Sequence, residues 1–142
     1  ITKIRTLNNF YIKYFKVKPK IAILGLNPHN AEYNKDSEEI KFIKPAISSL
    51  KKRFNVSGPY SADTAFGKAR LKKFNIIVGM YHDQVLAPYK TLYEFNAINM
   101  TLGLPYLRMT PDHGIANDKK KLNISSARSL NNCIEVMSRL IK

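Results

Sequence analysis

Apolar positions follow helical spacing at the start of the chain and then form a short continuous run. The first set comprises Ile4, Leu7, Tyr11, Tyr14 and Phe15. Their spacing predicts an amphipathic helix over about residues 2–16, which ends before Pro19 because proline cannot continue a helix. The run from Lys20 to Leu26 lies between Pro19 and Asn27-Pro28. It predicts a strand buried on both faces, as in a parallel sheet.

A second helix is predicted after this strand. Asp36 or Ser37 can cap it, and its first turn holds Glu38 and Glu39, which the positive end of the helix dipole favours. The stripe expected to be buried comprises Ile40, Ile43, Ile47 and Leu50. Pro45 falls inside this pattern, so it should kink the helix or shift its start.

Turn and capping residues then lead to a second strand. Gly58-Pro59 predicts a turn. After it, Asp63 is expected to cap a short helix over about residues 64–73. The apolar run from Phe74 to Tyr81 predicts another buried strand.

The last part of the chain carries two extended candidates and one clear helix. Residues from about 97–101 and 105–109 are expected to be extended, interrupted by Gly103-Leu104-Pro105. Ser125 or Ser126 can cap a final helix. Its apolar positions are Ala127, Leu130, Ile134, Met137 and Ile141. Strands that alternate with helices predict the α/β class, layered as α/β/α around a mainly parallel sheet.

The composition describes one globular body without a membrane segment. With 142 residues and 44% hydrophobic content, the chain can bury one core and is too short for two ordinary domains. The sequence has no run of about 18 apolar residues and no apolar signal-peptide region, so we expect no membrane partner. The single Cys133 is expected to be a small buried apolar residue, and it suits a cytoplasmic protein.

The formal net charge of +14 would by itself suggest a nucleic-acid or anionic-membrane partner. The basic residues are, however, spread in pairs and triplets, such as Lys51-Lys52-Arg53 and Lys119-Lys120-Lys121. They lack the interleaved aromatic residues of a single-strand platform and the spacing of a zinc finger. We therefore expect no specific nucleic-acid partner and only non-specific affinity for polyanions.

Each of the three histidines lies in a polar segment close after an apolar one. In open α/β sheets, ligands bind at the carboxyl ends of the strands, which would put His29 and His82 on the functional edge. Imidazole is a common ligand of divalent metals and a common acid or base near neutral pH. The separation of these histidines matches no local metal-binding pattern, so spacing alone also allows them to be polar surface groups.

Five sequence blocks change that interpretation. They are LGLNPH (24–29), GPYSADTAF (58–66), VGMYHDQ (78–84), NMTLGLPYLR (99–108) and PDHGIA (111–116). In order and approximate spacing they resemble the 4-hydroxythreonine-4-phosphate dehydrogenase family of vitamin B6 biosynthesis. The resemblance implies a partial fold similar to that of isocitrate and isopropylmalate dehydrogenases. Residues 1–142 are then expected to be the C-terminal portion of such an enzyme, with the N-terminal half absent.

The resemblance also implies roles for individual residues. His29 and His82 match two of the three histidines that hold a divalent metal in the family, and the third lies upstream of this chain. Lys90, Asn99 and Arg108 match residues that bind the substrate. Lysine and arginine in these positions would hold anionic groups of the substrate, arginine through two parallel hydrogen bonds.

Supporting residues, cofactors and the reaction follow from the same resemblance. Asp83, Asp112 and His113 are possible supports of the site, and no residue is assigned a catalytic role. The implied cofactors are NAD, or NADP, and a divalent metal, which is Zn, Mg or Co. The implied reaction oxidises 4-phosphooxy-threonine to 2-amino-3-oxo-4-phosphooxybutanoate, which decarboxylates to 3-amino-2-oxopropyl phosphate. The active enzyme is expected to be a cytoplasmic homodimer with a shared active site.

Departures from the family pattern keep alternatives open. The segment NAEYNKDSEE lacks the family's glycines, and Val85 and Asn96-Ala97 stand where glycine is usual. If Val85 had to adopt positive φ, its β-branched side chain would make that costly. Gly25 and Gly103 form no GxGxxG fingerprint, so NAD is implied by the family alone. The alternatives are a dehydrogenase for a phosphorylated threonate or erythronate, and a non-catalytic remnant with polyanion affinity.

Overall fold

Two compact units make up the chain, Ile1–Pro88 and Tyr89–Lys142. The computed structural model describes residues 1–30, 34–112 and 126–141. Within these ranges, no helix is both long enough and apolar enough to cross a membrane.

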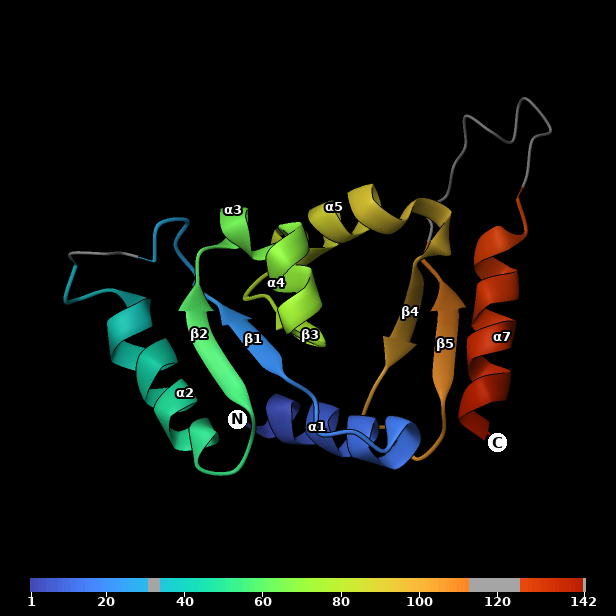
Figure 1. Cartoon of the computed structure of the whole chain (residues 1–142), viewed down its shortest axis with the longest axis horizontal. Coiled ribbons are helices and arrows are strands. Elements are labelled where there is room, and N and C mark those ends of the chain that lie inside the picture. The colour runs from blue at the N-terminus through green and yellow to red at the C-terminus, as the bar shows by residue number, and fades with distance from the viewer. Residues whose placement is uncertain (31–33, 113–125, 142) are drawn as a thin grey trace. The chain divides into compact units, whose positions relative to one another are not determined.

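The first unit is built on a three-stranded parallel sheet (Figure 1). In spatial order its strands are β2 (Val56–Tyr60), β1 (Ile21–Leu24) and β3 (Ile76–Val78). Ile21 in the central strand pairs with Val56 on one side and with Ile76 on the other. Both predicted apolar runs therefore form strands, but β3 is half-buried and not fully buried as predicted. Their parallel pairing and the intervening helices confirm the predicted α/β class.

The central strand β1 lies in the core of this unit, because all four of its residues are buried. Ile4 reaches the same core from α1 (Thr2–Phe15), the first predicted helix. Ile47 and Leu50 reach it from α2 (Lys44–Lys51). Complete burial of an aliphatic side chain of this size contributes about 1.5–3 kcal/mol. This cluster is therefore the main apolar contribution to the stability of the unit.

The helix around Pro45 begins differently from an ordinary α-helix. A π-helical turn, η1 (Glu39–Ile43), precedes α2. Pro45 lies in the first turn of α2, where its missing amide hydrogen would have no helical acceptor. At the start of the segment, the Ser37 hydroxyl accepts the Ile40 amide hydrogen at 3.4 Å. Ser37 thus contacts the first turn of the segment, although the N-cap position of η1 is Glu38, and the proline shifts the start of the α-helix.

Gly58-Pro59 lies within strand β2, so the predicted turn was wrong. The peptide bond between the two residues is cis, and Gly58 has a φ of 134°. A Cβ atom at Gly58 would collide with the carbonyl oxygen of Ile23 in β1. Glycine and proline indicate an irregular edge strand as well as a turn. Pairing with β1 decides between the two, and the local sequence does not contain that information.

The helix predicted over residues 64–73 is divided in two. The first part, α3 (Ala62–Ala65), begins earlier than predicted, and α4 (Lys68–Lys73) follows it. Asp63 lies in the first turn of α3 and is not its cap, since the N-cap position is Ser61. The carboxylate still lies at the end of the helix that favours negative charge.

Helix α5 (His82–Tyr93) forms where no helix was predicted. Pro88 lies inside it and, in the sequence alone, argues against a helix. Val85 is a helical residue of α5 and does not have positive φ. The absence of glycine at this position therefore causes no backbone strain.

The second unit holds an antiparallel strand pair and a helix (Figure 1). Its elements are η2 (Glu94–Asn96), β4 (Ile98–Thr101), β5 (Arg108–Pro111) and α7 (Arg128–Ile141). Strand β4 and helix α7 confirm the predictions, and β5 begins later than predicted. Ser126 accepts the Arg128 amide hydrogen at 3.3 Å, two residues before the helix begins at Arg128, and Ser125 lies outside the described residues. The buried Ser129 hydroxyl donates to the Ala97 carbonyl oxygen at 2.9 Å and fixes α7 beside the strands.

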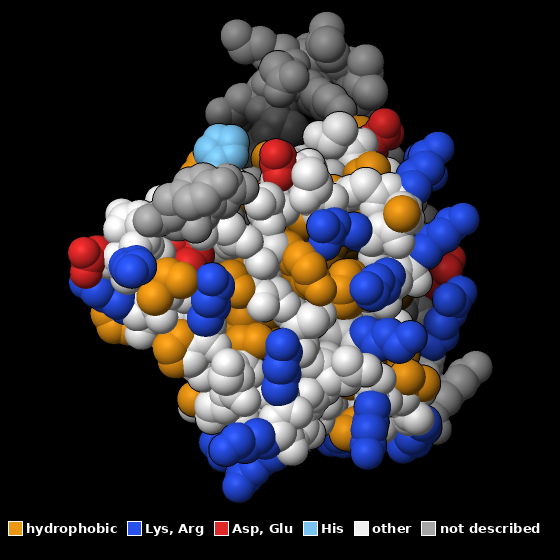
Figure 2. All heavy atoms as spheres, turned by 60° about the vertical axis from the view of Figure 1, so that its left-hand side comes forward, with side chains coloured by type: hydrophobic (Ala, Val, Ile, Leu, Met, Phe, Trp, Pro, Cys, Tyr) orange, Lys and Arg blue, Asp and Glu red, His pale blue; other side chains and the backbone are white. Residues whose placement is uncertain are grey.

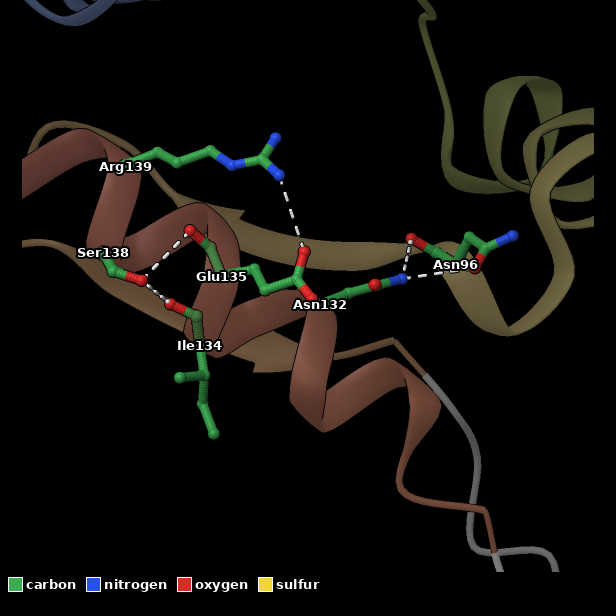
Figure 3. A network of polar contacts seen from close by, with 6 residues as sticks. All are labelled: Asn96, Asn132, Ile134, Glu135, Ser138 and Arg139. Carbon is green, nitrogen blue, oxygen red and sulfur yellow. Dashed lines mark hydrogen bonds and ion pairs between the residues drawn. The ribbon is translucent and has the colours of Figure 1, made fainter.

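Polar contacts also hold α7 to the residues before β4 (Figure 3). The Asn132 side-chain amide donates to the main-chain and side-chain oxygens of Asn96, each at 3.3 Å. Along the same helix, Arg139 and Glu135 form an ion pair at 3.6 Å. Ile134 points away from these groups. The helix therefore presents a polar side to η2 and an apolar side elsewhere.

The apolar stripe predicted for α7 is largely exposed. Leu130, Ile134 and Ile141 are 50%, 59% and 71% exposed. Together with Met109 of β5, these residues line a hollow of about 390 Å³. Cys133 is buried, as predicted, and burial raises the pKa of its thiol.

Lysine and arginine side chains are scattered over the face of the molecule drawn in Figure 2. Uncharged atoms lie between them, and apolar side chains are exposed in several places on the same face. The charges do not gather into one continuous stripe on this face. Scattered positive charges attract polyanions in a salt-sensitive way.

Two isoleucines of the same helical segment provide a test of the core. Ile47 is 2% exposed, but Ile40 is 38% exposed, which corrects the prediction that it is buried. We expect Ile47→Ala to lower the free energy of unfolding by about 2–5 kcal/mol, because it leaves a cavity. Ile40→Ala should lower it by less than about 1 kcal/mol. Urea unfolding of both variants checks this, and equal losses would contradict the observed burial.

Candidate metal and substrate site

His29 and His82 follow adjacent strands of the parallel sheet. His29 lies in the loop after β1, and His82 is the first residue of α5, shortly after β3. Because β1 and β3 are parallel neighbours, both histidines lie at the carboxyl edge of the sheet. Both are exposed to solvent. The structure thus gives the two histidines the edge position predicted for them.

The loop that carries His29 is held by a buried carboxylate. Glu39 is 0% exposed, and its Oε1 accepts the backbone N–H groups of Leu26 and Asn27, each at 2.7 Å. Its Oε2 accepts the Asn27 side-chain amide at 2.9 Å. Burial alone would raise the pKa of this carboxyl, but the hydrogen bonds outweigh it and lower the pKa. The sequence interpretation of Glu39 as a residue that only complements the helix dipole was therefore incomplete.

Gly25 leaves room for the side chains that support this loop. A Cβ atom there would collide with the Asn30 side chain and lie 3.3 Å from Glu39 Oε1. Asn30 adopts a left-handed conformation with a φ of 59°, and its amide donates to the Pro59 carbonyl oxygen at 2.7 Å. The loop after β1 is therefore fastened to the end of β2 as well as to η1.

The loops after β1 and β3 are joined by one side chain, Gln84 in the first turn of α5. Its Oε1 accepts the Met80 amide hydrogen at 2.8 Å. Its Nε2 donates to the Gly25 carbonyl oxygen at 2.7 Å. Gln84 is 7% exposed; its hydrogen bond to Gly25 is buried and its hydrogen bond to Met80 is partly buried. One amide group therefore connects the two segments that carry the histidines.

His82 has a carboxylate neighbour that can orient its ring. The Nδ1 atom lies 2.6 Å from Asp83 Oδ1, and both side chains are exposed. A carboxylate on one ring nitrogen leaves the other free to bind a metal, which is the usual arrangement of a metal-binding histidine. Among the described residues, no group of three histidine, cysteine, aspartate or glutamate side chains is placed to hold a metal ion. The chemistry of His29 and His82 fits a metal ion that takes its further ligands from outside the described residues.

The predicted substrate-binding residues all lie in the second unit. Asn99 pairs with Thr110, and Thr101 pairs with Arg108, in the antiparallel register of β4 and β5. Side chains of directly opposed residues share a face, and so do residues two positions apart. Asn99 and Arg108 therefore lie on the same face of the strand pair. Arg108 donates to the Thr101 hydroxyl at 2.8 Å.

Lys90 of α5 lies near the end of β5. Its Nζ is 3.6 Å from Asp112 Oδ1, whose side chain is 15% exposed. Burial, and after it the negative charges of Tyr93 and Asp112, raise the pKa of the neighbouring Tyr89. Lys90 thus belongs to a partly buried cluster and is not a freely solvated surface charge.

The predicted residues form two groups, one in each unit. His29, His82 and Asp83 belong to the first unit, whereas Lys90, Asn99, Arg108 and Asp112 belong to the second. His113 lies outside the described residues. Sequence reasoning assigned no site role to Glu39 or Gln84. In the sequence, both are polar residues beside an apolar segment, and Gln84 lies in the same block as His82. This position is the feature that could have indicated a role for them.

The parallel sheet, with helices between its strands, places the first unit among the open-sheet α/β proteins, the class in which ligands bind at the carboxyl ends of the strands. The chain belongs to the family described as pyridoxal phosphate biosynthetic protein PdxA, which matches residues 1–137. The family predicted from the five sequence blocks is thereby confirmed.

Curated relatives and solved structures of the same name agree with this assignment. The chain is 44% identical to a 4-hydroxythreonine-4-phosphate dehydrogenase of Sulfurihydrogenibium sp. (strain YO3AOP1), over 96% of this chain and 42% of the relative. It is 42% identical to one from Beijerinckia indica, over 87% of this chain and 37% of the relative. The crystal structure of 4-hydroxythreonine-4-phosphate dehydrogenase from Klebsiella pneumoniae matches with a TM-score of 0.79 and 32% identity, over 98% of this chain and 43% of that one. The chain thus spans less than half the length of these relatives.

The buried Glu39 carboxylate generates a prediction about pH. Because its folded-state pKa is lowered, its contribution to stability is complete above the ordinary pKa of 4.5 and disappears as the pH falls through the folded-state pKa. We expect Glu39→Gln to lower the free energy of unfolding by about 2 kcal/mol at neutral pH, because hydrogen bonds to a charge are lost. The difference from the unmodified protein should shrink at pH values below 4.5.

Urea unfolding over a series of pH values measures this difference. Glu38→Gln is the matched control, because Glu38 is the exposed neighbour and makes only a 3.4 Å contact with Asn27. An equal effect of the two substitutions, or a Glu39→Gln effect that does not change with pH, would contradict the assigned role.

Proposed function

We propose that this chain is part of an NAD-dependent 4-hydroxythreonine-4-phosphate dehydrogenase. The reaction takes a hydride from the carbon that bears the free hydroxyl of 4-phosphooxy-threonine and a proton from that hydroxyl. The product, 2-amino-3-oxo-4-phosphooxybutanoate, is a β-keto acid and loses carbon dioxide to give 3-amino-2-oxopropyl phosphate. The observation that carries the proposal is the family match over residues 1–137.

His29 and His82 would hold the divalent metal in this proposal. Both are exposed imidazoles at one sheet edge, and the Asp83 carboxylate can fix the tautomer of His82. Two imidazoles suit Zn or Co better than Mg, which prefers oxygen ligands. When bound, the metal polarises the substrate hydroxyl as a Lewis acid.

Lys90, Asn99 and Arg108 would bind the substrate. Lys90 and Arg108 offer positive charge to its anionic groups, and Arg108 can make two parallel hydrogen bonds. Asn99 and Arg108 share one face of the β4–β5 pair, which supports a common role. Asp112 would position Lys90 through their ion pair.

The active species would be a homodimer of a longer polypeptide with a shared active site. Catalytic zinc sites usually have three protein ligands, and the described residues offer two at this edge. The missing ligand would then come from a further segment or from the second subunit. NAD, or NADP, would accept the hydride, and we assign no residue of this chain to its binding. The buried free thiol of Cys133 is compatible with a reducing cytoplasm.

The proposed activity is tested with the native protein from its source, whose intact mass is first compared with the 16.3 kDa of this chain. We expect NADH formation with 4-phosphooxy-threonine and a divalent metal. His29→Ala and His82→Ala should each lower kcat/KM about a hundredfold or more, since metal polarisation contributes several kcal/mol.

Tyr81→Phe is the control for the histidine variants, because Tyr81 is exposed, adjacent to His82 and without an assigned role. A phosphorylated threonate or erythronate, offered in parallel, separates this enzyme from a sibling dehydrogenase. If both histidine variants keep full activity, the proposed metal site is wrong. No NADH with any of these substrates would favour a non-catalytic protein.

The substrate role of Lys90 gives a separate prediction. We expect Lys90→Met to raise the KM for the phosphorylated substrate about tenfold, because a charge-assisted contact is lost. Lys41→Met is matched to it, since Lys41 is also a half-exposed lysine paired with an aspartate, Asp36. Steady-state kinetics checks the difference. If both lysine variants raise KM equally, a general effect of positive charge would explain the result.

A further inference from the structure

Gln84 satisfies backbone groups that the sheet itself leaves unpaired. Beyond Val78, strand β3 no longer pairs with β1. The Met80 amide hydrogen and the Gly25 carbonyl oxygen, which follow the two strands, are instead bonded to opposite ends of one buried amide. The side chain thus continues the link between β1 and β3 past the end of the sheet.

An amide of this length is the group that this position requires. One end must accept a hydrogen bond and the other must donate one, which a carboxylate or an apolar side chain cannot do. Leaving either partner unpaired is costly, because the group has lost its contact with water and gained nothing in return. Gly79 contributes by lacking a side chain, because a Cβ there would lie 2.6 Å from a Val85 methyl group and 3.3 Å from Gln84 Oε1.

The position of the Gln84 link relates it to both histidines. Met80 lies two positions before His82, and Gly25 lies in the same loop segment as His29. Glu39 fastens the next two amides of that loop from another side. The His29 ring is exposed, so its position depends on how the backbone of the loop is held.

We propose that Gln84 is a positioning residue, which sets the spacing of His29 and His82 for the metal without touching the metal or the substrate. The inference rests on the proposed function, because it requires these two histidines to be ligands. Metal binding and the Gln84 link then favour the same loop arrangement. Each should stabilise the other, as any two coupled interactions do.

The test uses the native-length protein and Co²⁺ alone as the probe. Gln84→Met keeps the length of the side chain and removes both hydrogen bonds. We expect the affinity for Co²⁺ to fall about tenfold, the lower end of the effect of outer-shell changes on metal sites. The visible absorption bands of bound Co²⁺ should also change, because they report ligand geometry and not the stability of the fold.

Asn75→Ala is the matched control. The Asn75 side chain accepts the Lys20 amide hydrogen at 2.8 Å and links the same two strands at the opposite edge of the sheet. The Asn75→Ala variant should leave both the Co²⁺ affinity and the absorption bands of the bound Co²⁺ unchanged. Equal effects of the two variants would show that Gln84 acts only through stability and would overturn the inference.

His29→Ala separates failure of the inference from failure of the proposed function. If His29→Ala weakens Co²⁺ binding and Gln84→Met does not, the positioning role is wrong and the metal site stands. If His29→Ala has no effect on Co²⁺ binding, the proposed metal site itself is wrong, and the positioning role falls with it.

Hydrogen exchange of the unmodified protein provides a second measurement in case Gln84→Met does not fold. The Met80 amide is bonded to Gln84, whereas the Ile76 amide is bonded to Lys20 at the far edge. Zn²⁺ should slow exchange at Met80 about tenfold more than at Ile76, because binding and the Gln84 link are coupled. Equal slowing at the two amides would contradict the proposal.

Discussion

The burial of strand β1 on both faces is the constraint on which the first unit depends. A buried backbone N–H or C=O group without a partner is costly, so a strand in this position needs a neighbour on each side. Strands β2 and β3 supply those neighbours in parallel register. Side chains of α1 and α2 supply the apolar cover. The order of the sheet and the placement of these helices both follow from that requirement.

The same constraint explains the polar side chains at the carboxyl edge. Past Leu24, the chain leaves the ladder while it is still partly buried, and its backbone groups need other partners. Glu39 accepts two of the amide hydrogens, and Gln84 donates to the carbonyl of Gly25. Contacts that complete the hydrogen bonding of the fold therefore also fix the loops that carry His29 and His82. Stability and the geometry of the proposed metal site share these side chains.

In the second unit, the β4–β5 strand pair carries apolar side chains on one face and polar side chains on the other. Met109 lies with the exposed stripe of α7, whereas the neighbouring Arg108 lies on the face that also carries Asn99. Alternation along a strand makes this possible, because successive side chains point to opposite faces. Asn99 and Arg108, two of the three predicted substrate residues, are therefore brought onto one face by register, although several residues separate them in the sequence.

Sequence reasoning succeeded where one local pattern outweighed the rest and failed where distant contacts decided. The continuous apolar runs of β1 and β3 and the periodicity of α1 and α7 were sufficient to predict those elements. The interior Pro88 concealed α5, and Gly58-Pro59 concealed β2, because both residue types fit more than one backbone. Ile40 was predicted to be buried on α-helical spacing, which the π-turn of η1 does not follow.

By itself, the sequence determined the α/β class, the family and the two histidines that follow strands, because these depend on residue types and their order along the chain. Only the tertiary structure decided which strands are neighbours, and hence that the two histidines lie at one edge. It also decided that Glu39 and Gln84 hold the loops there. A hydrogen bond between Gln84 and Gly25 leaves no trace in the local pattern, since it forms only after β1 and β3 have paired.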